Sequence, residues 1–356
     1  MDKMEVMDKV GVYIYGIINS NSASDHFTPK DSYKKESVYT IPYQDVSAAV
    51  SNSEIIEHAY SSKDTLARLL VWHQKVIEKI MSLGHTIIPI KLGTFAIDEA
   101  EVKDTLIKGY TLIKNVMENI RDKIETDVVA TWADFNSTLK EIGEEKEIKK
   151  FKEKILANTK RITVDDQMKA GVMAKKALDK KREKYALKIQ TFLKNYCAAF
   201  KVHELMDDRM VINAAFLLNK REQKDFDRKV EEINNKFAEK LNFRCVGPLP
   251  PYSFYTLEIK KMQFEEIDWA KKKLRLLGDF ATKNEIKKAY KTLAFSFHPD
   301  RNPNTPGIEK EFDEVTKAYR ILADYCGACK QAGSVDSLSF NEEEFEKNTI
   351  LVKVKD

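Results

Sequence analysis

The order of apolar and polar positions in the first 135 residues predicts a sheet with helices packed on it. β-Branched and aromatic residues gather in short runs, as they do in strands. Elsewhere, apolar residues recur at three- and four-residue spacing through 63–82 and 99–124, which predicts two amphipathic helices. The predicted strands are 12–19, 38–42, 45–51, 86–96 and 126–135. One sheet with two helices is an α+β arrangement.

Two long helices are predicted to follow this first domain. Residues 137–157 and 166–206 are rich in Lys, Glu, Ala and Leu, which favour helix. The second of them carries one apolar stripe. The stripe consists of Tyr185, Ile189, Phe192, Tyr196 and Phe200. We expect it to pack against the sheet of its own domain. A partner helix in a coiled coil is the alternative, although no strict heptad is sustained.

A second α+β unit is predicted between residues 209 and 259. Residues 209–219 have the pattern of a strand, 221–241 that of an amphipathic helix, and 243–259 that of two strands around a proline-rich turn. In the turn, three of the four residues Pro248-Leu249-Pro250-Pro251 lack an N–H group, so they cannot form regular helix or a central strand. We expect a rigid corner there, followed by a charged connection over 260–273.

The pattern of apolar and charged residues in the last part of the chain predicts a helical hairpin. Residues 285–304 begin with one apolar face and one lysine-rich face, and Thr282 or Asn284 is placed to cap the helix start. This helix must end before Pro299, because proline disfavours helix in the residue that precedes it. Residues 309–325 form a second, acidic helix with its own apolar face. The residues around Pro299 are therefore expected in an exposed turn between two antiparallel helices.

Composition and charge narrow the classes of function. The 356 residues are 43% apolar and 33% charged, and the charges nearly cancel at +4. Wrapping nucleic acid needs a basic face of one sign, so no nucleic-acid partner is expected. The N-terminus lacks the apolar run of a signal peptide, and no stretch approaches the ~18 apolar residues of a membrane span. We expect a cytoplasmic protein without a membrane span.

Site motifs for catalysis or metal binding are not evident. The pair Cys326 and Cys329 has the C-x-x-C spacing, but we expect it after the end of a helix, where the dipole disfavours a thiolate. A zinc site would need two more ligands. Free thiols, or a surface pair that happens to oxidise, are the expectation, and a redox or metal site is the alternative. His73 lies inside an amphipathic helix and is expected to be a structural or surface histidine rather than a catalytic one. With no nucleotide-binding or hydrolase motif, we expect no enzyme, cofactor or metal.

Two segments of the C-terminal hairpin resemble a known module. Residues 285–304 and 309–325 resemble helices two and three of the J domain of DnaJ co-chaperones, and 273–280 resembles its first helix. The resemblance implies binding to a DnaK-type chaperone and stimulation of its ATP hydrolysis. A J fold kept only for structure is the alternative. The residues that would carry the binding are His298, Pro299, Asp300, Lys287, Lys288, Lys291 and Arg301.

The first 260 residues resemble a different family, the gas vesicle proteins GvpF and GvpL. The resemblance rests on segments that occur in the same order: 12–18, 41–51, 73–81, 87–96, 210–219 and 247–254. It implies two α+β, partly ferredoxin-like domains with long connecting helices. It also implies an accessory role in building gas vesicles, with the shell protein and other accessory proteins as partners, and it brings no catalytic residues.

Together these patterns predict an α+β chain that ends in an all-α J-domain hairpin. The expected parts are an N-terminal α+β domain at 1–136, long helices with a second α+β domain at 137–260, a J domain at 265–330 and a tail at 331–356. The expected function is gas vesicle assembly with recruitment of a DnaK-type chaperone, at the vesicle in the cytoplasm. The alternatives are a general J-domain co-chaperone and a minor shell component with a vestigial J domain.

Overall fold

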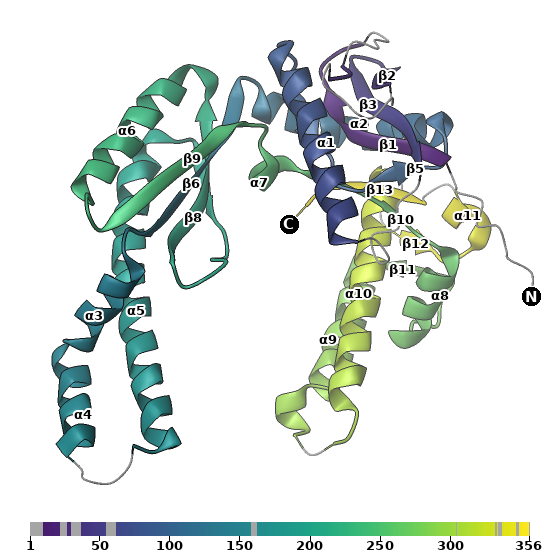
Figure 1. Cartoon of the computed structure of the whole chain (residues 1–356). Coiled ribbons are helices and arrows are strands. Elements are labelled where there is room, and N and C mark those ends of the chain that lie inside the picture. The colour runs from purple at the N-terminus through teal and green to yellow at the C-terminus, as the bar shows by residue number, and fades with distance from the viewer. Residues whose placement is uncertain are drawn as a thin grey trace, which may run out of the picture. The chain divides into compact units, whose positions relative to one another are not determined.

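The chain divides into two compact units in the computed structural model (Figure 1). Unit 1 comprises residues 1–119 and 255–356, and unit 2 comprises residues 120–254. The strand ladders of both units are antiparallel, and helices cover them, so the predicted α+β class is confirmed. The structure describes residues 10–21, 27–29, 37–54, 62–157, 162–303, 305–331, 333, 337–346 and 349–355.

The N-terminal sheet of unit 1 has the strand order β2-β3-β1-β4, and β5 also pairs with β1. Its elements are β1 Val10–Ile18, β2 Tyr39–Tyr43, β3 Val46–Glu54, α1 Lys63–Ser82, β4 Ile87–Pro89, β5 Phe95–Ala96 and α2 Glu99–Ile120. These confirm the predicted elements up to residue 120, with the run 86–96 divided into β4 and β5 by a turn and the helix predicted at 99–124 ending at Ile120. The central strand β1 is buried from Gly11 to Ile18, because it has neighbours along both edges and helices over its faces.

A buried polar network crosses this core. The hydroxyl of Tyr13 lies 2.7 Å from Nδ1 of His73, and the indole N–H of Trp72 donates to the hydroxyl of Tyr15 at 2.8 Å. Burial lowers the pKa of His73 to about 4, so the imidazole is neutral at pH 7. His73 is therefore a structural residue, which is one of the two roles expected from its place in an amphipathic helix.

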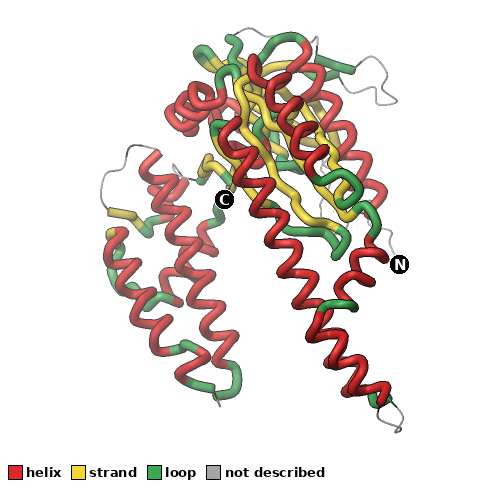
Figure 2. The backbone as a smooth tube through the Cα atoms, turned by 90° about the vertical axis from the view of Figure 1, so that its left-hand side faces the viewer, coloured by secondary structure: helices red, strands yellow, loops and turns green. Residues whose placement is uncertain are grey.

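Unit 2 is built on a four-stranded sheet with the order β7-β8-β6-β9 (Figure 2). Its elements are β6 Lys123–Trp132, α3 Phe135–Gly143, α4 Lys146–Ala157, α5 Val164–Leu193, η2 Lys194–Tyr196, β7 Ala199–Val202, β8 Met210–Asn219, η3 Lys220–Glu222, α6 Gln223–Lys236, β9 Leu241–Leu249 and α7 Tyr252–Tyr255. The assignment of 126–135 to the N-terminal sheet was wrong, because β6 pairs with β8 and β9. The sequence pattern predicts a strand but carries no information on its partners.

The predicted apolar stripe of α5 packs within unit 2, as expected. Ile189 is fully buried, and the Tyr185 ring lies between Trp132 and Phe237. The helix is shorter than predicted, however, since it ends at Leu193. Phe192 still lies in the helix, but the last two stripe residues, Tyr196 and Phe200, lie in η2 and β7.

A buried carboxylate holds the proline-rich corner of unit 2. β9 is an edge strand, which explains how it accommodates Pro248. Beyond it, the backbone N–H and the hydroxyl of Ser253 donate to Oε2 and Oε1 of Glu125 at 2.8 and 2.7 Å. Nε2 of His203 lies 3.1 Å from the same hydroxyl. A side chain at Gly247 would come within 3.0 Å of the Glu125 carbonyl oxygen. The backbone of β9 at Gly247 therefore lies directly against β6.

Burial raises the pKa of Glu125 to about 7, although the hydrogen bonds from Ser253 lower it. Because the folded chain keeps this proton up to a higher pH than the unfolded chain, Glu125 costs stability as the pH rises from about 4.5 through 7. We predict that the parent loses stability between pH 5 and pH 8 and that Glu125→Gln does not. The difference in unfolding free energy, variant minus parent, should therefore increase by up to roughly 3 kcal/mol over this pH range. Urea denaturation at each pH measures this difference. The exposed Glu183→Gln in the same unit should show no such gain, and an equal gain there would contradict the assignment.

The C-terminal part of unit 1 is helical, with short strands at its margins. Its elements are β10 Leu257–Lys261, α8 Phe264–Lys273, β11 Phe280–Thr282, α9 Lys283–Ser296, η4 Pro299–Arg301, α10 Ile308–Gln331, β12 Ser337–Ser339, α11 Glu342–Glu346 and β13 Ile350–Val354. Two predictions were wrong here. Residues 260–273 are not a connection, because they contain α8. The segment 273–280, expected as a helix, is mostly loop, because the helix lies just before it.

A ribbon of two strands joins the C-terminal helices to the rest of unit 1. β10 pairs with β13 along its whole length, so Val352 lies opposite Ile259. The buried Val352 also packs so closely on α2 that a side chain at Gly109 would come within 2.8 Å of it. On the other side, the side chain of Gln331 at the end of α10 bonds both backbone polar groups of Val352. The ribbon is thus held between α2 and α10.

We predict that Val352→Asp releases β13 from β10. An unpaired carboxylate at this buried position should cost more than about 3 kcal/mol of local stability. Hydrogen–deuterium exchange should then show faster exchange of the amides at 257–261, while α9 stays protected. Lys355→Asp introduces the same group on an exposed residue at the end of the ribbon and should leave exchange unchanged. Unaltered protection of β10 in the Val352 variant would show that β13 does not hold it.

Candidate functional site

The first helix of the C-terminal hairpin, α9, begins at a complete capping box. The Thr282 hydroxyl accepts from the backbone N–H of Glu285, and the Glu285 carboxylate accepts from the backbone N–H of Thr282 at 2.7 Å. Of the two caps considered from the sequence, Thr282 is the one used. The helix ends at Ser296, as the proline at 299 requires.

The second helix, α10, holds α9 through a shared apolar face (Figure 1). Val315, Ala318 and Leu322 are fully buried on it, as predicted. The rings of Tyr290 on α9 and Tyr319 on α10 stack with centroids 4.3 Å apart. This packing fixes the two helices side by side and therefore fixes the ends from which the connecting turn leaves.

The His298-Pro299-Asp300 turn stands at the open end of this hairpin. Nδ1 of His298 accepts the backbone N–H of Asp300 at 3.2 Å, and its ring meets the Phe312 ring of α10 edge-on at 5.4 Å. The Asp300 side chain is 89% exposed and that of His298 44%. The amide of Asn302 donates to the carbonyl oxygens of Ser296 and His298 at 2.9 and 3.1 Å. The turn is rigidly anchored, and both of its polar side chains face solvent.

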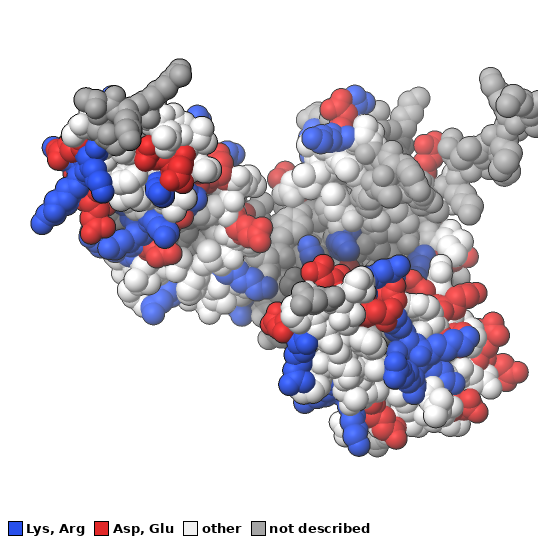
Figure 3. Space-filling model, turned by 90° about the horizontal axis from the view of Figure 1, so that it is seen from below, with Lys and Arg blue, Asp and Glu red and all other residues white. Residues whose placement is uncertain are grey.

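The predicted lysines of α9 lie together on its outer face. Lys287, Lys288 and Lys291 are exposed, and they make no ion pair with any residue that the structure describes. Figure 3 shows a group of lysine and arginine side chains on the C-terminal part of unit 1, with acidic and further basic side chains around it. Unpaired cations on one helix face create a positive potential that attracts an acidic partner surface.

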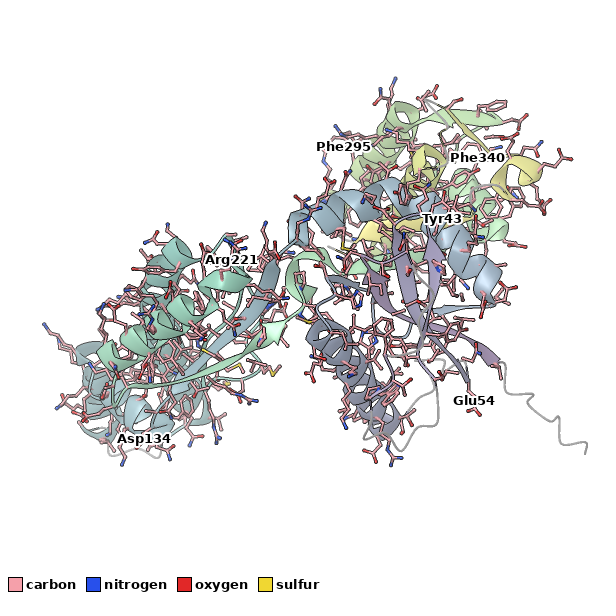
Figure 4. All side chains as sticks on the ribbon, turned by 90° about the horizontal axis from the view of Figure 1, so that it is seen from above. Tyr43, Glu54, Asp134, Arg221, Phe295 and Phe340 are labelled. Carbon is pink, nitrogen blue, oxygen red and sulfur yellow. The ribbon has the colours of Figure 1, made fainter. Side chains whose placement is uncertain are left out.

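Arg301 differs from the other predicted basic residues, because it is already engaged. Its guanidinium carbon lies 3.5 Å from the centroid of the Phe295 ring. Phe295 is 61% exposed and lies on the outside of α9 (Figure 4). The sequence reasoning assigned no role to Phe295, nor to Asn302, which anchors the turn. The period of the apolar face marks neither residue, since both lie off it.

The cysteine pair lies in a different setting from the one expected. Cys326 and Cys329 are inside α10, which continues to Gln331, and both thiols are free and buried. The expectation of a position after the helix end was wrong, because packing on β13 extends the helix. Burial raises the pKa of the Cys329 thiol to about 11, so it is not a thiolate at pH 7. Within the described ranges, no group of three or more His, Cys, Asp or Glu residues is arranged to hold a metal ion.

Comparison with family profiles identifies both parts of the chain. The profile described as gas vesicle synthesis protein GvpL/GvpF matches residues 11–256, which is more than half of the chain. The chain belongs to the GvpL/GvpF family. A second profile, the DnaJ domain, matches residues 272–326, which include the lysine-bearing helix α9, the turn and most of the acidic helix α10. The protein is therefore a gas vesicle-related protein with a J domain.

Solved structures share the fold of the GvpL/GvpF part. The crystal structure of the gas vesicle protein GvpF from Anabaena sp. PCC7120 is 21% identical, with a TM-score of 0.56, and the match covers 68% of this chain and 97% of that one. The GvpF structure from Microcystis aeruginosa is 20% identical, with a TM-score of 0.55 and coverage of 68% and 98%. At this identity the likeness establishes the fold.

Curated DnaJ proteins match a short segment of the chain in its J domain. A chaperone protein DnaJ from Wolbachia sp. subsp. Drosophila simulans (strain wRi) is 54% identical over 48 residues, and one from Wolbachia pipientis subsp. Culex pipiens (strain wPip) is 57% identical over 44 residues. These segments are 13% and 12% of those proteins, so the chain spans only a small part of their length. A search of the described helices finds none long and apolar enough to cross a bilayer.

We predict that reversing the charge of the α9 face slows partner binding. Lys287→Glu with Lys288→Glu and Lys291→Glu should lower the association rate with a DnaK-type chaperone at least ~10-fold at low salt, and less at high salt. Stopped-flow fluorescence measures the rate. A control with the same charge change places Glu at the exposed positions Lys310, Lys330 and Lys355. Equal slowing in both variants would mean that net charge, and not this face, steers the encounter.

Proposed function

We propose that this GvpL/GvpF protein is a gas vesicle assembly factor that recruits a DnaK-type chaperone through its J domain and stimulates its ATP hydrolysis. The observation that carries the proposal is the His298-Pro299-Asp300 turn. It is anchored on both sides, exposed, and placed beside an unpaired lysine face. A turn kept only to connect two helices has no need of a solvent-facing histidine and aspartate held in one geometry.

Docking would use two kinds of contact. The lysines of α9 supply long-range attraction, which raises the rate of encounter with an acidic surface. The turn then supplies short, directional contacts, because the Asp300 carboxylate is exposed and Nε2 of His298 remains available while Nδ1 is used within the turn. Arg301 is held over Phe295, so we assign it to shaping the turn as well as to contact with the partner.

The GvpL/GvpF part would bind the protein on which the chaperone acts, the gas vesicle shell subunit. A subunit that builds a gas-filled shell must present a large apolar face, and before assembly such a face is an aggregation hazard. A protein that binds the subunit and also recruits a chaperone would prevent its aggregation at the site where the shell grows. The proposal gives neither part a catalytic group, and it needs no cofactor.

The family match favours this function over a general co-chaperone. Residues 11–256 match one family dedicated to gas vesicles, whereas a binder of varied clients would present flexible, adaptable surface. In addition, the β10–β13 ribbon fixes the J domain on the N-terminal sheet domain. A chaperone docked at the turn would therefore be kept close to whatever this domain holds.

Single-turnover ATP hydrolysis by a DnaK-type chaperone from the same cell tests the proposal. We predict that the parent chain stimulates hydrolysis and that His298→Gln and Asp300→Asn reduce the stimulation at least ~10-fold, because each removes a polar contact made at the turn. Asp279→Asn is the matched control, since that aspartate is equally exposed but lies outside the site. It should stimulate like the parent.

Binding of the gas vesicle shell protein tests the assembly role separately from chaperone recruitment. Co-precipitation with the full chain should be the same for the parent and His298→Gln, because the turn lies outside the GvpL/GvpF part. No stimulation by the parent, with a chaperone that responds to another J protein, would contradict the recruiting role. No capture of the shell protein by either chain would contradict the assembly role.

A further inference from the structure

The distal half of the α4–α5 hairpin in unit 2 lacks a core of its own. Of the residues described in 146–157 and 162–177, none is buried. The seam between the helices consists of half-buried side chains. These are Ile148, Phe151 and Ile155 on α4, and Ala170, Met173, Ala174 and Ala177 on α5. Figure 2 shows these two helices extending side by side beyond the sheet. Two helices alone leave the flanks of their seam open, so the hairpin presents apolar surface that a third element would cover.

A second set of apolar side chains lies outside this seam. Val164, Met168 and Val172 are 70%, 60% and 54% exposed and follow one another at four-residue spacing along α5. Leu156 at the end of α4 is 65% exposed. Single exposed apolar residues are ordinary, but a row at i, i+4 and i+8 is the pattern of a helix that meets another helix. We call these four residues the hairpin stripe.

The charge around the stripe indicates what it meets. α4 and α5 together carry thirteen lysines and arginines against six aspartates and glutamates, a net charge of +7 in a chain whose total is +4. Lys176 continues the row of Met168 and Val172, and Lys152 lies one turn before Leu156. Neither lysine makes an ion pair within the described part of the chain. The stripe is therefore flanked by cations that are free to pair.

We propose that the α4–α5 hairpin docks an acidic amphipathic helix of another protein, with the hairpin stripe against its apolar face and the flanking lysines against its carboxylates. A second copy of this chain fits poorly, because two hairpins of net charge +7 repel each other. A lipid surface fits poorly too, because it takes helices with a broad apolar face, whereas this stripe is one residue wide. The proposal does not depend on chaperone recruitment.

Photo-crosslinking tests the occupant directly. The full-length chain carries p-benzoyl-phenylalanine in place of Met168 and is irradiated in its native cells. The control carries the same group in place of Leu187, which is 64% exposed on α5 but lies off the stripe. We expect an adduct specific to position 168, and mass spectrometry of the joined peptides should map it to a partner segment with helical periodicity and net negative charge.

Binding of that segment, made as a synthetic peptide, supplies the second measurement. Met168→Glu and Val172→Glu should each weaken binding to the full-length chain at least ~10-fold, since each sets a charge between apolar faces and repels the acidic peptide. Leu187→Glu should change the affinity less than ~2-fold, and binding should weaken as salt is raised.

Each other outcome overturns the proposal. An adduct between two copies would make the stripe a self-association surface, and an adduct with unit 1 of the same chain would make it internal packing. A lipid adduct would make the hairpin a membrane contact. No adduct beyond that of the position-187 control, or equal loss of peptide binding in Leu187→Glu, would leave the stripe without a partner.

Discussion

Burial of the apolar side of α10 is the constraint on which unit 1 depends. One half of this helix buries Val315 and Leu322 against α8 and α9 and so creates the hairpin that carries the His-Pro-Asp turn. The other half lies on β13, where Gly327 allows Leu351 to approach within 3.2 Å of the position that a side chain would take. One continuous helix therefore belongs both to the J domain and to the strand ribbon that fixes this domain on the N-terminal sheet.

One end of α10 supports the turn and the other packs on the strand ribbon, and these two ends are far apart. Phe312, which supports His298, precedes Gly327 by fifteen residues, a distance of roughly 22 Å along a helix at ~1.5 Å per residue. In the proposed function, a chaperone bound at the turn would therefore lie away from the ribbon. Asp324 lies between them and receives Lys260 from β10 and Lys353 from β13, so each strand of the ribbon is tied to the helix by charge as well as by packing.

Two regions of unit 2 depart from the usual burial of apolar side chains and exposure of charged ones. Glu125 is buried at the proline-rich corner, where its carboxylate bonds Ser253 twice and so orders a segment that offers few backbone donors. At the hairpin the reverse holds, because Val164, Met168 and Val172 face solvent among lysines. The first departure is resolved inside the unit by hydrogen bonds. The second has no such compensation within unit 2, and for this reason we propose a partner helix there.

Sequence patterns alone determined the type of most elements, the end of α9 before Pro299 and the exposed turn, and they limited the cap of α9 to Thr282 or Asn284, because these depend on neighbours within a few residues. They also determined both family resemblances. Only the tertiary structure decided that β6 belongs to the second sheet, that α8 precedes residue 273, that Cys326 lies within α10, and that β13 pairs with β10. Strand pairing and the extension of a helix by packing depend on contacts between distant residues, which periodicity along the chain does not record.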